Sequence, residues 1–407
     1  MGYLLFFFVE VLFLFRVEKT MWGKYITPLN MLMLPFVFAT FVAIIYPLID
    51  GDIPHYYLPS LVLWMFGLVL FEIPSCILAY QFNRQRNYQL FIIKEGKYDD
   101  FYVVLKYIAY FCILLSLLKL GSLSSQMDSF GTDEFSEQYQ SKGIFAHLSV
   151  LLSAIFSYAI YKLDRNHKSA IIIVAGALIG MYAVGTKSWI IAPVFIGYLA
   201  RLLSGRTKIT LKNLLFPIIL ATFLFFFSYY LIIVVSLNNE LDSDLMIYLV
   251  NHFIDYFCSG SLTLSIDYRL GFIEPDMTDA LFGPIINIFN ALFGLEYVKV
   301  INPVFIDIGT LGASNVRTFF GTIYAYSHSV FVLVLMTLLF SFITNLIYAY
   351  ARKSKSIFLS LANCSNLVFL ALGFFEFYWL NLSCYELFFL FLIMHFFLNR
   401  QYRVQKI

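Results

Sequence analysis

Three basic residues, Lys187, Arg269 and Arg317, lie in polar segments beside long apolar runs. A guanidinium group binds phosphate oxygens in pairs, and a lysine adds a compact point charge, so such a set suits a pyrophosphate. Asn315 and Thr318 flank Arg317 and can also hydrogen-bond phosphate oxygens. The alternative is that each cation forms a structural ion pair with a nearby carboxylate.

Acid–base chemistry has three candidates in the same part of the chain, Asp255, Asp267 and His328. Histidine titrates near neutral pH and can serve as an acid or a base. The alternative for His328 is a hydrogen-bonded packing role at a helix end. His, Cys and carboxylate residues show no metal-ligand spacing, so we expect neither a metal nor another cofactor.

Carboxylates also occur inside apolar runs, where an unpaired charge costs several kcal/mol. Glu72, Glu376 and Glu386 are of this kind. They are candidates for a proton pathway or, equally, for helix-packing partners. The five cysteines lack C-x-x-C spacing and are predicted to be packing residues, with Cys258 alone facing the outer side.

The elements that position these residues are predicted to be membrane helices. The sequence is 61% hydrophobic and 13% charged, with a mean hydropathy of +0.80, whereas soluble domains are about 25% charged. Long apolar runs satisfy their backbone only as helices in a bilayer. We expect a single all-α integral membrane domain over residues 1–407, with about eleven spans. They fall at residues 2–17, 27–49, 57–80, 101–120, 144–163, 168–185, 187–204, 212–236, 321–350, 356–380 and 382–399.

Basic residues alternate between connections, which sets the predicted orientation. Most of the 27 Lys and Arg residues lie in alternate connections and in the C-terminal tail, while the intervening connections are acidic or nearly neutral. The N-terminus is therefore expected outside and the C-terminus in the cytoplasm. The net charge of +2 gives no reason to expect a nucleic-acid partner.

Residues 237–320 form the longest segment that is not predicted to span the membrane, and it falls on the outer side. Long connections are usually functional or disordered, and the many Phe, Ile, Leu and Tyr residues here argue against disorder. Residues 244–261 and 279–293 have helical apolar spacing and are predicted as helices at the membrane surface or in the mouth of the bundle.

Several segments in this order resemble bacterial oligosaccharide repeat-unit polymerases of the Wzy type. They are Gly-Thr-Lys-Ser at residues 185–188, the Tyr and small-residue run at 256–261, Phe-Gly-Pro-Ile at 282–285, Asn-Val-Arg-Thr at 315–318, and Tyr324. The chain departs from that pattern at Tyr326-Ser327-His328, where many members have Asp-Phe-Gly after the Tyr.

The resemblance implies a glycosyl transfer at the outer face of the bacterial inner membrane. A glycan carried on undecaprenyl pyrophosphate moves onto a new lipid-linked repeat unit, and a chain-length regulator protein is a further implied partner. Arg317, His328 and Asp267 would be catalytic. Substrate would be bound by Lys187, Arg269, Asn315, Thr318, Tyr324 and Tyr256.

Three other functions stay open at this point. A flippase for lipid-linked oligosaccharides would need charges through the bundle and, usually, two related halves, and no internal repeat is visible. A ligase that moves finished glycan to another acceptor would use the same cations. A structural assembly partner is the third.

Overall fold

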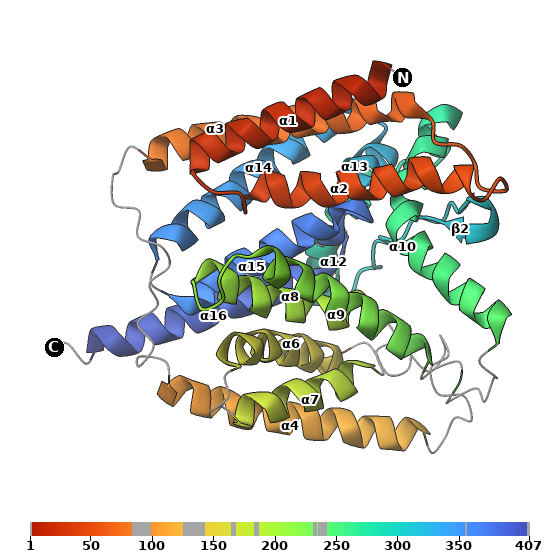
Figure 1. The fold of residues 1–407 in the computed structure, drawn as a ribbon. Coiled ribbons are helices and arrows are strands. Elements are labelled where there is room, and N and C mark those ends of the chain that lie inside the picture. Colours follow the sequence, from red (N-terminus) through yellow and green to blue (C-terminus); the bar gives the residue numbers. More distant parts are fainter. Residues whose placement is uncertain are drawn as a thin grey trace. The chain divides into compact units, whose positions relative to one another are not determined.

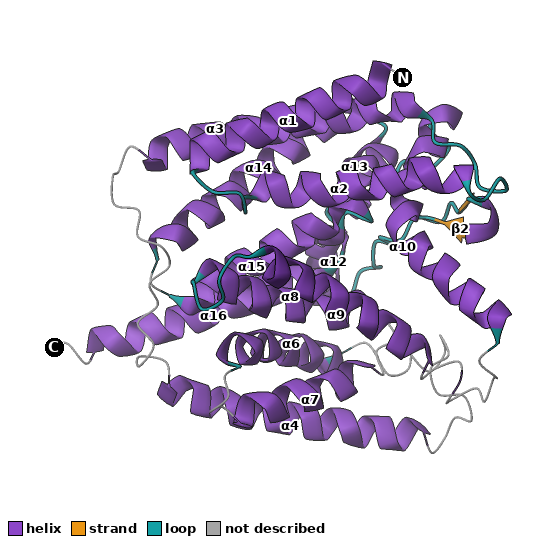
Figure 2. Cartoon of the chain, viewed as in Figure 1, coloured by secondary structure: helices purple, strands orange, loops and turns teal. Residues whose placement is uncertain are grey.

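The computed structural model describes residues 2–83, 99–124, 143–163, 168–182, 187–230, 234, 242–354 and 356–404. Helices make up most of these residues, and the two strands β1 (Ile306–Asp307) and β2 (Ala313–Ser314) form one short antiparallel hairpin (Figure 2). The predicted all-α class is confirmed. The chain, expected as one domain, divides into two compact units, and each is described by itself.

The first unit contains residues 1–88, 250–350 and 366–384. Its N-terminal helices α1 and α3 pack along each other (Figure 1). Its helices are α1 (Gly2–Trp22), α2 (Pro28–Ile45), α3 (Leu61–Asn83), most of α10 (Ser243–Leu270), α11 (Thr278–Leu281), α12 (Gly283–Phe293), α13 (Phe319–Ser327) and most of α14 (Val330–Lys353).

Local signals explain where α2 begins. The Thr27 hydroxyl accepts a hydrogen bond from the backbone N–H of Asn30 at 3.4 Å, and Pro28 occupies the first helical position. A capping hydroxyl satisfies one unpaired N–H of the first turn, and proline lacks the N–H that would be unpaired there. The chain therefore turns from α1 into α2 within a few residues.

The second unit contains residues 89–249, 351–365 and 385–407. A half-buried arginine closes one end of α6, because the Arg201 Nη1 donates to the carbonyl of Tyr161 at 2.8 Å and to that of Leu163 at 2.7 Å. The unit is built from α4 (Asp99–Ser124), α6 (Ile144–Lys162), α7 (Lys168–Tyr182), α8 (Lys187–Leu203), α9 (Leu211–Tyr229) and most of α15 (Ile357–Ala371) and α16 (Leu382–Val404).

Seven of the described helices are long and apolar enough to cross a membrane, so the count of eleven is not confirmed. Three further predicted spans correspond to shorter apolar helices, and α1 is a long helix that carries several charges. The seven candidates are Pro28–Leu48, Leu58–Phe82, Phe101–Leu123, Ile144–Lys162, Leu211–Tyr229, Val330–Lys353 and Ile357–Phe374.

Two predicted spans are wrong in their bounds. The span at 321–350 is broken at His328, whose left-handed backbone (φ 48°) ends α13. The Ser329 hydroxyl then accepts from the Val332 N–H at 3.3 Å and starts α14. The span at 356–380 stops being α-helical after Ala371, because the Phe375 carbonyl accepts the Thr318 N–H at 3.0 Å instead of continuing a helix.

The predicted outer segment is folded rather than loosely connected. The helix expected at 244–261 extends to Leu270, and the one expected at 279–293 is divided into α11 and α12 at Gly283-Pro284. One side of α10 packs in an apolar cluster with α2 and β1, made of Ala43, Ile53, Cys258, Leu262, Ile266, Ile306 and Ile308. This packing fixes the end of α10 against the hairpin.

Candidate functional site

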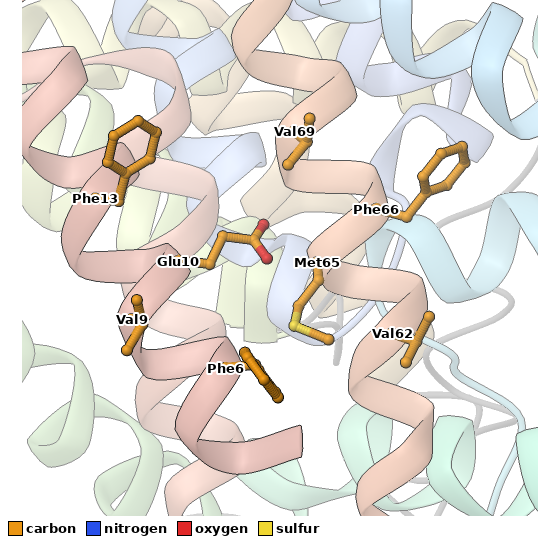
Figure 3. Close-up of a pocket in the computed structure, with 8 residues that line it drawn as sticks. All are labelled: Phe6, Val9, Glu10, Phe13, Val62, Met65, Phe66 and Val69. Atoms are coloured by element: carbon orange, nitrogen blue, oxygen red, sulfur yellow. The ribbon is translucent and has the colours of Figure 1, made fainter. Parts of the chain in front are cut away.

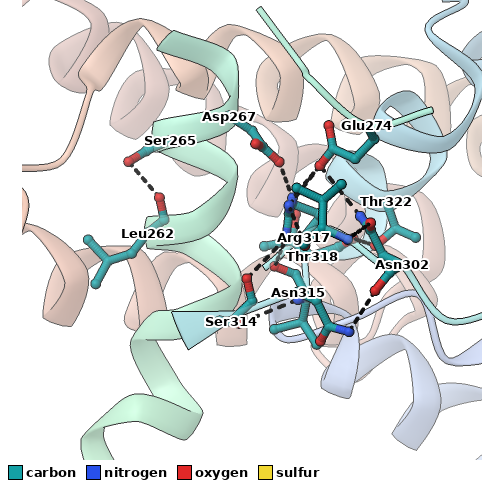
Figure 4. Close-up of polar contacts among 12 residues, drawn as sticks. Leu262, Ser265, Asp267, Glu274, Asn302, Ser314, Asn315, Arg317, Thr318 and Thr322 are labelled. Atoms are coloured by element: carbon teal, nitrogen blue, oxygen red, sulfur yellow. Dashed lines mark hydrogen bonds and ion pairs between the residues drawn. The ribbon is translucent and has the colours of Figure 1, made fainter. Parts of the chain in front are cut away.

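A buried ion cluster ties the end of α10 to the segment after the hairpin (Figure 4). The side chains of Arg317, Asp267 and Glu274 are all 0% exposed. The Arg317 Nε donates to Asp267 Oδ2, and its Nη2 lies 2.7 Å from Glu274 Oε1. We call these three residues the ion triad. It matches the ion-pair alternative that the sequence left open for Arg317.

The remaining Arg317 donors also point to protein oxygens. Nη2 donates to the carbonyl of Val304 at 3.3 Å, and Nη1 donates to those of Val316 at 3.4 Å and Ser314 at 3.5 Å. Arg317 was expected at a helix mouth accessible to a pyrophosphate. That placement is wrong for this conformation, because the guanidinium is enclosed by the folded outer segment.

The charges of the ion triad balance if one carboxyl keeps its proton. Burial, followed by the hydrogen bond with Glu274, raises the pKa of Asp267 to about 8. Burial alone would raise the pKa of Glu274 too, but the hydrogen bond from Asp267 and the charge of Arg317 hold it below its usual value. At neutral pH the cluster is therefore one guanidinium, one carboxylate and one protonated acid.

Turns and amides position Glu274. After α10, Gly271 (φ 81°) and Phe272 (φ 55°) take left-handed conformations, and the Phe272 N–H donates to the Asp267 carbonyl at 2.9 Å. This turn reverses the chain toward Arg317. The Asn302 amide donates to Glu274 Oε1 at 3.4 Å, and the Asn315 amide donates to the Asn302 carbonyl at 2.9 Å.

Thr318 holds an unusual backbone beside the ion triad. Its φ of 66° lies where a β-branched residue is rarely found, which costs about 1–3 kcal/mol unless the surroundings impose it. Its hydroxyl accepts from the Trp64 indole N–H at 3.0 Å. Its carbonyl accepts from the Thr322 hydroxyl at 2.7 Å. These contacts hold the residue that follows Arg317 in one strained position, fully buried, so Thr318 does not face solvent as predicted for a ligand.

His328 is exposed, and one of its ring nitrogens is fixed by the outer segment. Its Nε2 lies 2.9 Å from the backbone carbonyl of Glu274. A carbonyl oxygen only accepts, so Nε2 carries the hydrogen and Nδ1 holds the lone pair of the neutral ring. Hydrogen bonds from Thr278 lower the pKa of Asp276, and the nearby His328 contributes to the same shift.

The chain belongs to a family of unknown function, DUF6337. The family matches residues 52–404, which is most of the sequence. No curated protein and no solved structure matches the chain. The family match covers the ion triad and His328.

The other predicted site residues of this DUF6337 protein lie in several parts of the fold. The Tyr324 ring packs edge-on against Phe272 at 4.9 Å. Arg269 is exposed at the end of α10. Tyr256 stacks on Phe375 with ring centroids 5.6 Å apart. Lys187 begins α8 in the second unit; its side chain, and the turn before it at Gly185 and Thr186, lie outside the described residues.

The sequence did not single out Glu274, which lies 43 residues before its partner Arg317. No spacing connects the two, so only the folded chain reveals the pair. Two other carboxyls have pKa values raised by burial to about 7, that of Asp255 in α10 and that of Glu376 after α15. Within the described part of the chain, no group of His, Cys, Asp and Glu residues can hold a metal ion.

Carboxyls elsewhere have partners of a different kind. In the first unit, Glu18 and Glu72 face each other between α1 and α3, are 0% and 7% exposed, and interact with each other. The Ser75 hydroxyl donates to Glu18, and the Cys76 thiol donates to Glu72 at 2.9 Å. In the second unit, Glu386 pairs with His147, with 2.7 Å between Oε1 and Nδ1.

A groove of about 600 Å³ between α1 and α3 is apolar apart from one acid (Figure 3). It shares no residue with the ion triad and lacks the converging polar groups of a substrate site. Its lining residues are Phe6, Val9, Glu10, Phe13, Val62, Met65, Phe66 and Val69. The polar outer segment, not this groove, is the candidate functional site.

Proposed function

We propose that this protein polymerises lipid-linked oligosaccharide repeat units at the outer face of the bacterial inner membrane. The nascent glycan leaves undecaprenyl pyrophosphate and joins the new repeat unit, with the outer segment outside and the C-terminus in the cytoplasm. The observation that carries the proposal is the exposed His328, whose Nδ1 is left as the base by the bond from Nε2 to Glu274. It lies outside all seven candidate spans, where a lipid-linked sugar would be reached from the membrane surface.

The reaction needs a base and a counter-charge. His328 Nδ1 takes the proton of an acceptor sugar hydroxyl, and that oxygen attacks the anomeric carbon of the nascent glycan. The bond from this carbon to the pyrophosphate oxygen breaks, and the oxygen keeps the electron pair. Arg269, exposed at the end of α10, would stabilise the departing pyrophosphate.

The ion triad has a positioning role in this scheme. Arg317 and Asp267 hold Glu274, and the Glu274 carbonyl holds the His328 ring. Asn315 and Asn302 support the same residue, while Tyr324 and Tyr256 supply aromatic surface for sugars. Lys187 as a second phosphate ligand, and a chain-length regulator as a partner, remain predictions from the sequence.

The test is His328→Asn, because asparagine tolerates the left-handed backbone but cannot act as a base. We expect polymer formation to fall about 100- to 10,000-fold, which is the usual contribution of a positioned base. His55→Ala removes another exposed histidine of the first unit and serves as the matched control. Full-length surface polymer from a well-expressed His328→Asn variant would remove His328 from the mechanism.

Deletion of the protein separates the remaining functions. Single repeat units in place of long chains, seen on gels of surface glycan, support the polymerase. Long polymer left on the lipid carrier would indicate a ligase.

A flippase is the second candidate, because the buried Glu18 and Glu72 pair resembles what a proton-coupled carrier needs. Complete loss of repeat units from the surface after deletion would favour this function over the polymerase.

A further inference from the structure

Four polar residues of α10 recur at every fourth position, Asp255, Ser259, Thr263 and Asp267. Residues four apart lie on the same side of a helix with their Cβ atoms about 6 Å apart. We call these residues the α10 file. It runs from the middle of the helix to the ion triad (Figure 4 shows the end at Asp267).

Each residue of the α10 file has a buried side-chain oxygen that has no hydrogen-bond partner in the described part of the protein. Ser259 and Thr263 are 1% and 0% exposed, and their hydroxyls have no partner there. The same holds for Asp255 Oδ1. A buried polar group without a partner costs about 1–3 kcal/mol, so each such atom calls for an explanation.

Several other buried helical hydroxyls donate to the preceding turn, whereas those of Thr337 in α14 and Ser360 in α15 also have no partner among the described residues. Ser265, on the same helix, donates to the Leu262 carbonyl at 2.9 Å. In α13, Thr322 donates to the Thr318 carbonyl at 2.7 Å and Ser327 donates to the Ile323 carbonyl at 2.8 Å. Ser259 and Thr263 do not make this bond to the preceding turn. Their oxygens are therefore available to a molecule that fits between the positions of the file.

The two ends of the α10 file differ in access. Asp267 is completely buried; its Oδ2 accepts from Arg317 Nε, and its Oδ1 has no partner among the described residues. Asp255 is only partly buried. Neighbouring positions of the file have Cβ atoms about 6 Å apart, a spacing at which one water molecule can bridge two polar side chains.

We infer that the α10 file binds a chain of water molecules that conducts protons between the buried Asp267 and the partly exposed Asp255. A proton enters the chain at one carboxyl and leaves at the other, so no net bond is made or broken. The inference does not depend on glycosyl transfer. Its consequence is that the charge of the ion triad follows the pH outside the fold.

Known neighbours define which groups influence the two ends. Arg317 and Glu274 face Asp267. Burial, followed by the charge of Asp255, raises the pKa of Cys258, which lies one turn further along α10. His252 lies one turn before Asp255. Tyr46 contacts the same turn of α10, because its hydroxyl donates to Asn251 Oδ1 at 2.8 Å. Asp50 interacts electrostatically with Tyr46.

The test measures proton exchange directly in the purified full-length protein. After transfer into D₂O, the carbonyl stretch of a protonated carboxyl shifts in the infrared, and comparison with Asp267→Asn assigns the band of Asp267. Thr263→Val keeps the shape of the side chain but removes the hydroxyl. We expect it, and Ser259→Ala, to slow the exchange of the Asp267 proton about tenfold or more, as the loss of one hydrogen bond in the path would.

Two controls make the result specific. Thr263→Ser restores a hydroxyl and should exchange as fast as wild type. Ser265→Ala removes a buried hydroxyl that already has a partner and should leave the exchange rate unchanged. Unchanged exchange in the Ser259→Ala/Thr263→Val double variant would overturn the α10 file. If the variants exchange the proton slowly while deletion of the protein leaves polymer length unaltered, the proposal of the α10 file stands and the polymerase function is rejected.

Discussion

Among the described residues of the first compact unit, the most deeply buried carboxyls form two pairs, and the pairs differ in which groups lie beside them. Asp267 and Glu274 enclose a guanidinium, with all three side chains inaccessible. Glu18 and Glu72 have hydroxyl and thiol donors, and no cationic side chain among the described residues forms a salt bridge with either. In the ion triad, the guanidinium of Arg317 balances the buried carboxylate. Glu18 and Glu72 must instead be neutralised by protons or by a bound cation.

This difference determines what a substitution does. Removing the cation of the ion triad leaves a buried charge with no partner, which is expensive. Replacing a carboxyl that already carries a proton by its amide changes little, because the amide keeps the shape and the hydrogen-bonding capacity. The predictions below, from the largest effect to the smallest, test whether the two groups really differ in this way.

Arg317→Ala should produce the largest loss. The Glu274 carboxylate would remain buried without its cation, at a cost of about 3–5 kcal/mol. The amount of folded protein in the membrane should fall. A triple variant in which apolar residues of similar size replace Arg317, Asp267 and Glu274 should recover part of that amount. If Arg317→Ala is abundant and folded but makes no polymer, Arg317 contacts substrate directly and the positioning role is wrong.

The two carboxyls of the ion triad should substitute for each other. Asp267→Asn leaves the Glu274 carboxylate for Arg317, and in Glu274→Gln the remaining Asp267 loses its proton and takes that place. Each single change should cost about 1 kcal/mol, whereas the double change leaves Arg317 unpaired. A double-mutant cycle of thermal unfolding in detergent should show a coupling of about 1–3 kcal/mol. Simple additivity would mean that the carboxyls act separately.

The stability of the wild-type protein should fall as pH rises toward 8. The pKa of Asp267, about 8 in the fold, lies above its usual value of 3.8, so between these values the folded state holds a proton that the unfolded chain has released. Folding stability from this group is complete at low pH and is lost as pH rises through the folded pKa, by at most about 1.4 kcal/mol per pH unit. Unfolding temperatures should fall between pH 6 and 8 and level off at higher pH, and Asp267→Asn should remove this dependence.

Glu72→Gln should have the smallest effect on stability, about 1 kcal/mol or less, because the amide replaces a protonated acid. Abundance in the membrane and the unfolding temperature are the measurements. A large loss of stability would show that the pair is ionised around a bound cation. Normal abundance combined with loss of all surface repeat units would favour the flippase.

The sequence predicted the membrane helices best where an apolar run coincides with one helix, as for α2, α3 and α6. It failed at His328, because the left-handed backbone of this residue ends α13 and the Ser329 hydroxyl caps α14 between two apolar stretches. The pattern of apolar and polar residues does not reveal such a cap, which becomes visible only in the folded structure.

The candidate site was predicted in part. Asp267, Arg317 and His328 were singled out, and the fold brings Asp267 to Arg317 and His328 to the backbone of Glu274. The enclosure of Arg317 was not predictable, because it depends on Glu274, far along the chain, and on the hairpin that places Val304 and Ser314 around the guanidinium. A charge beside an apolar run looks the same in sequence whether it faces a ligand or a partner.

Thr318 has consequences for how the protein is made. The Trp64 indole that donates to its hydroxyl is synthesised 254 residues earlier, and the Phe375 carbonyl that accepts from its N–H is synthesised later. Contacts that close long loops form late, since the chain must lose the entropy of the whole intervening segment. The early helices α2 and α3 therefore leave the ribosome without a partner for the Trp64 indole. This part of the protein reaches its final packing only when nearly all of the chain has been translated, so a truncation before residue 375 should leave even its first helices open to proteolysis.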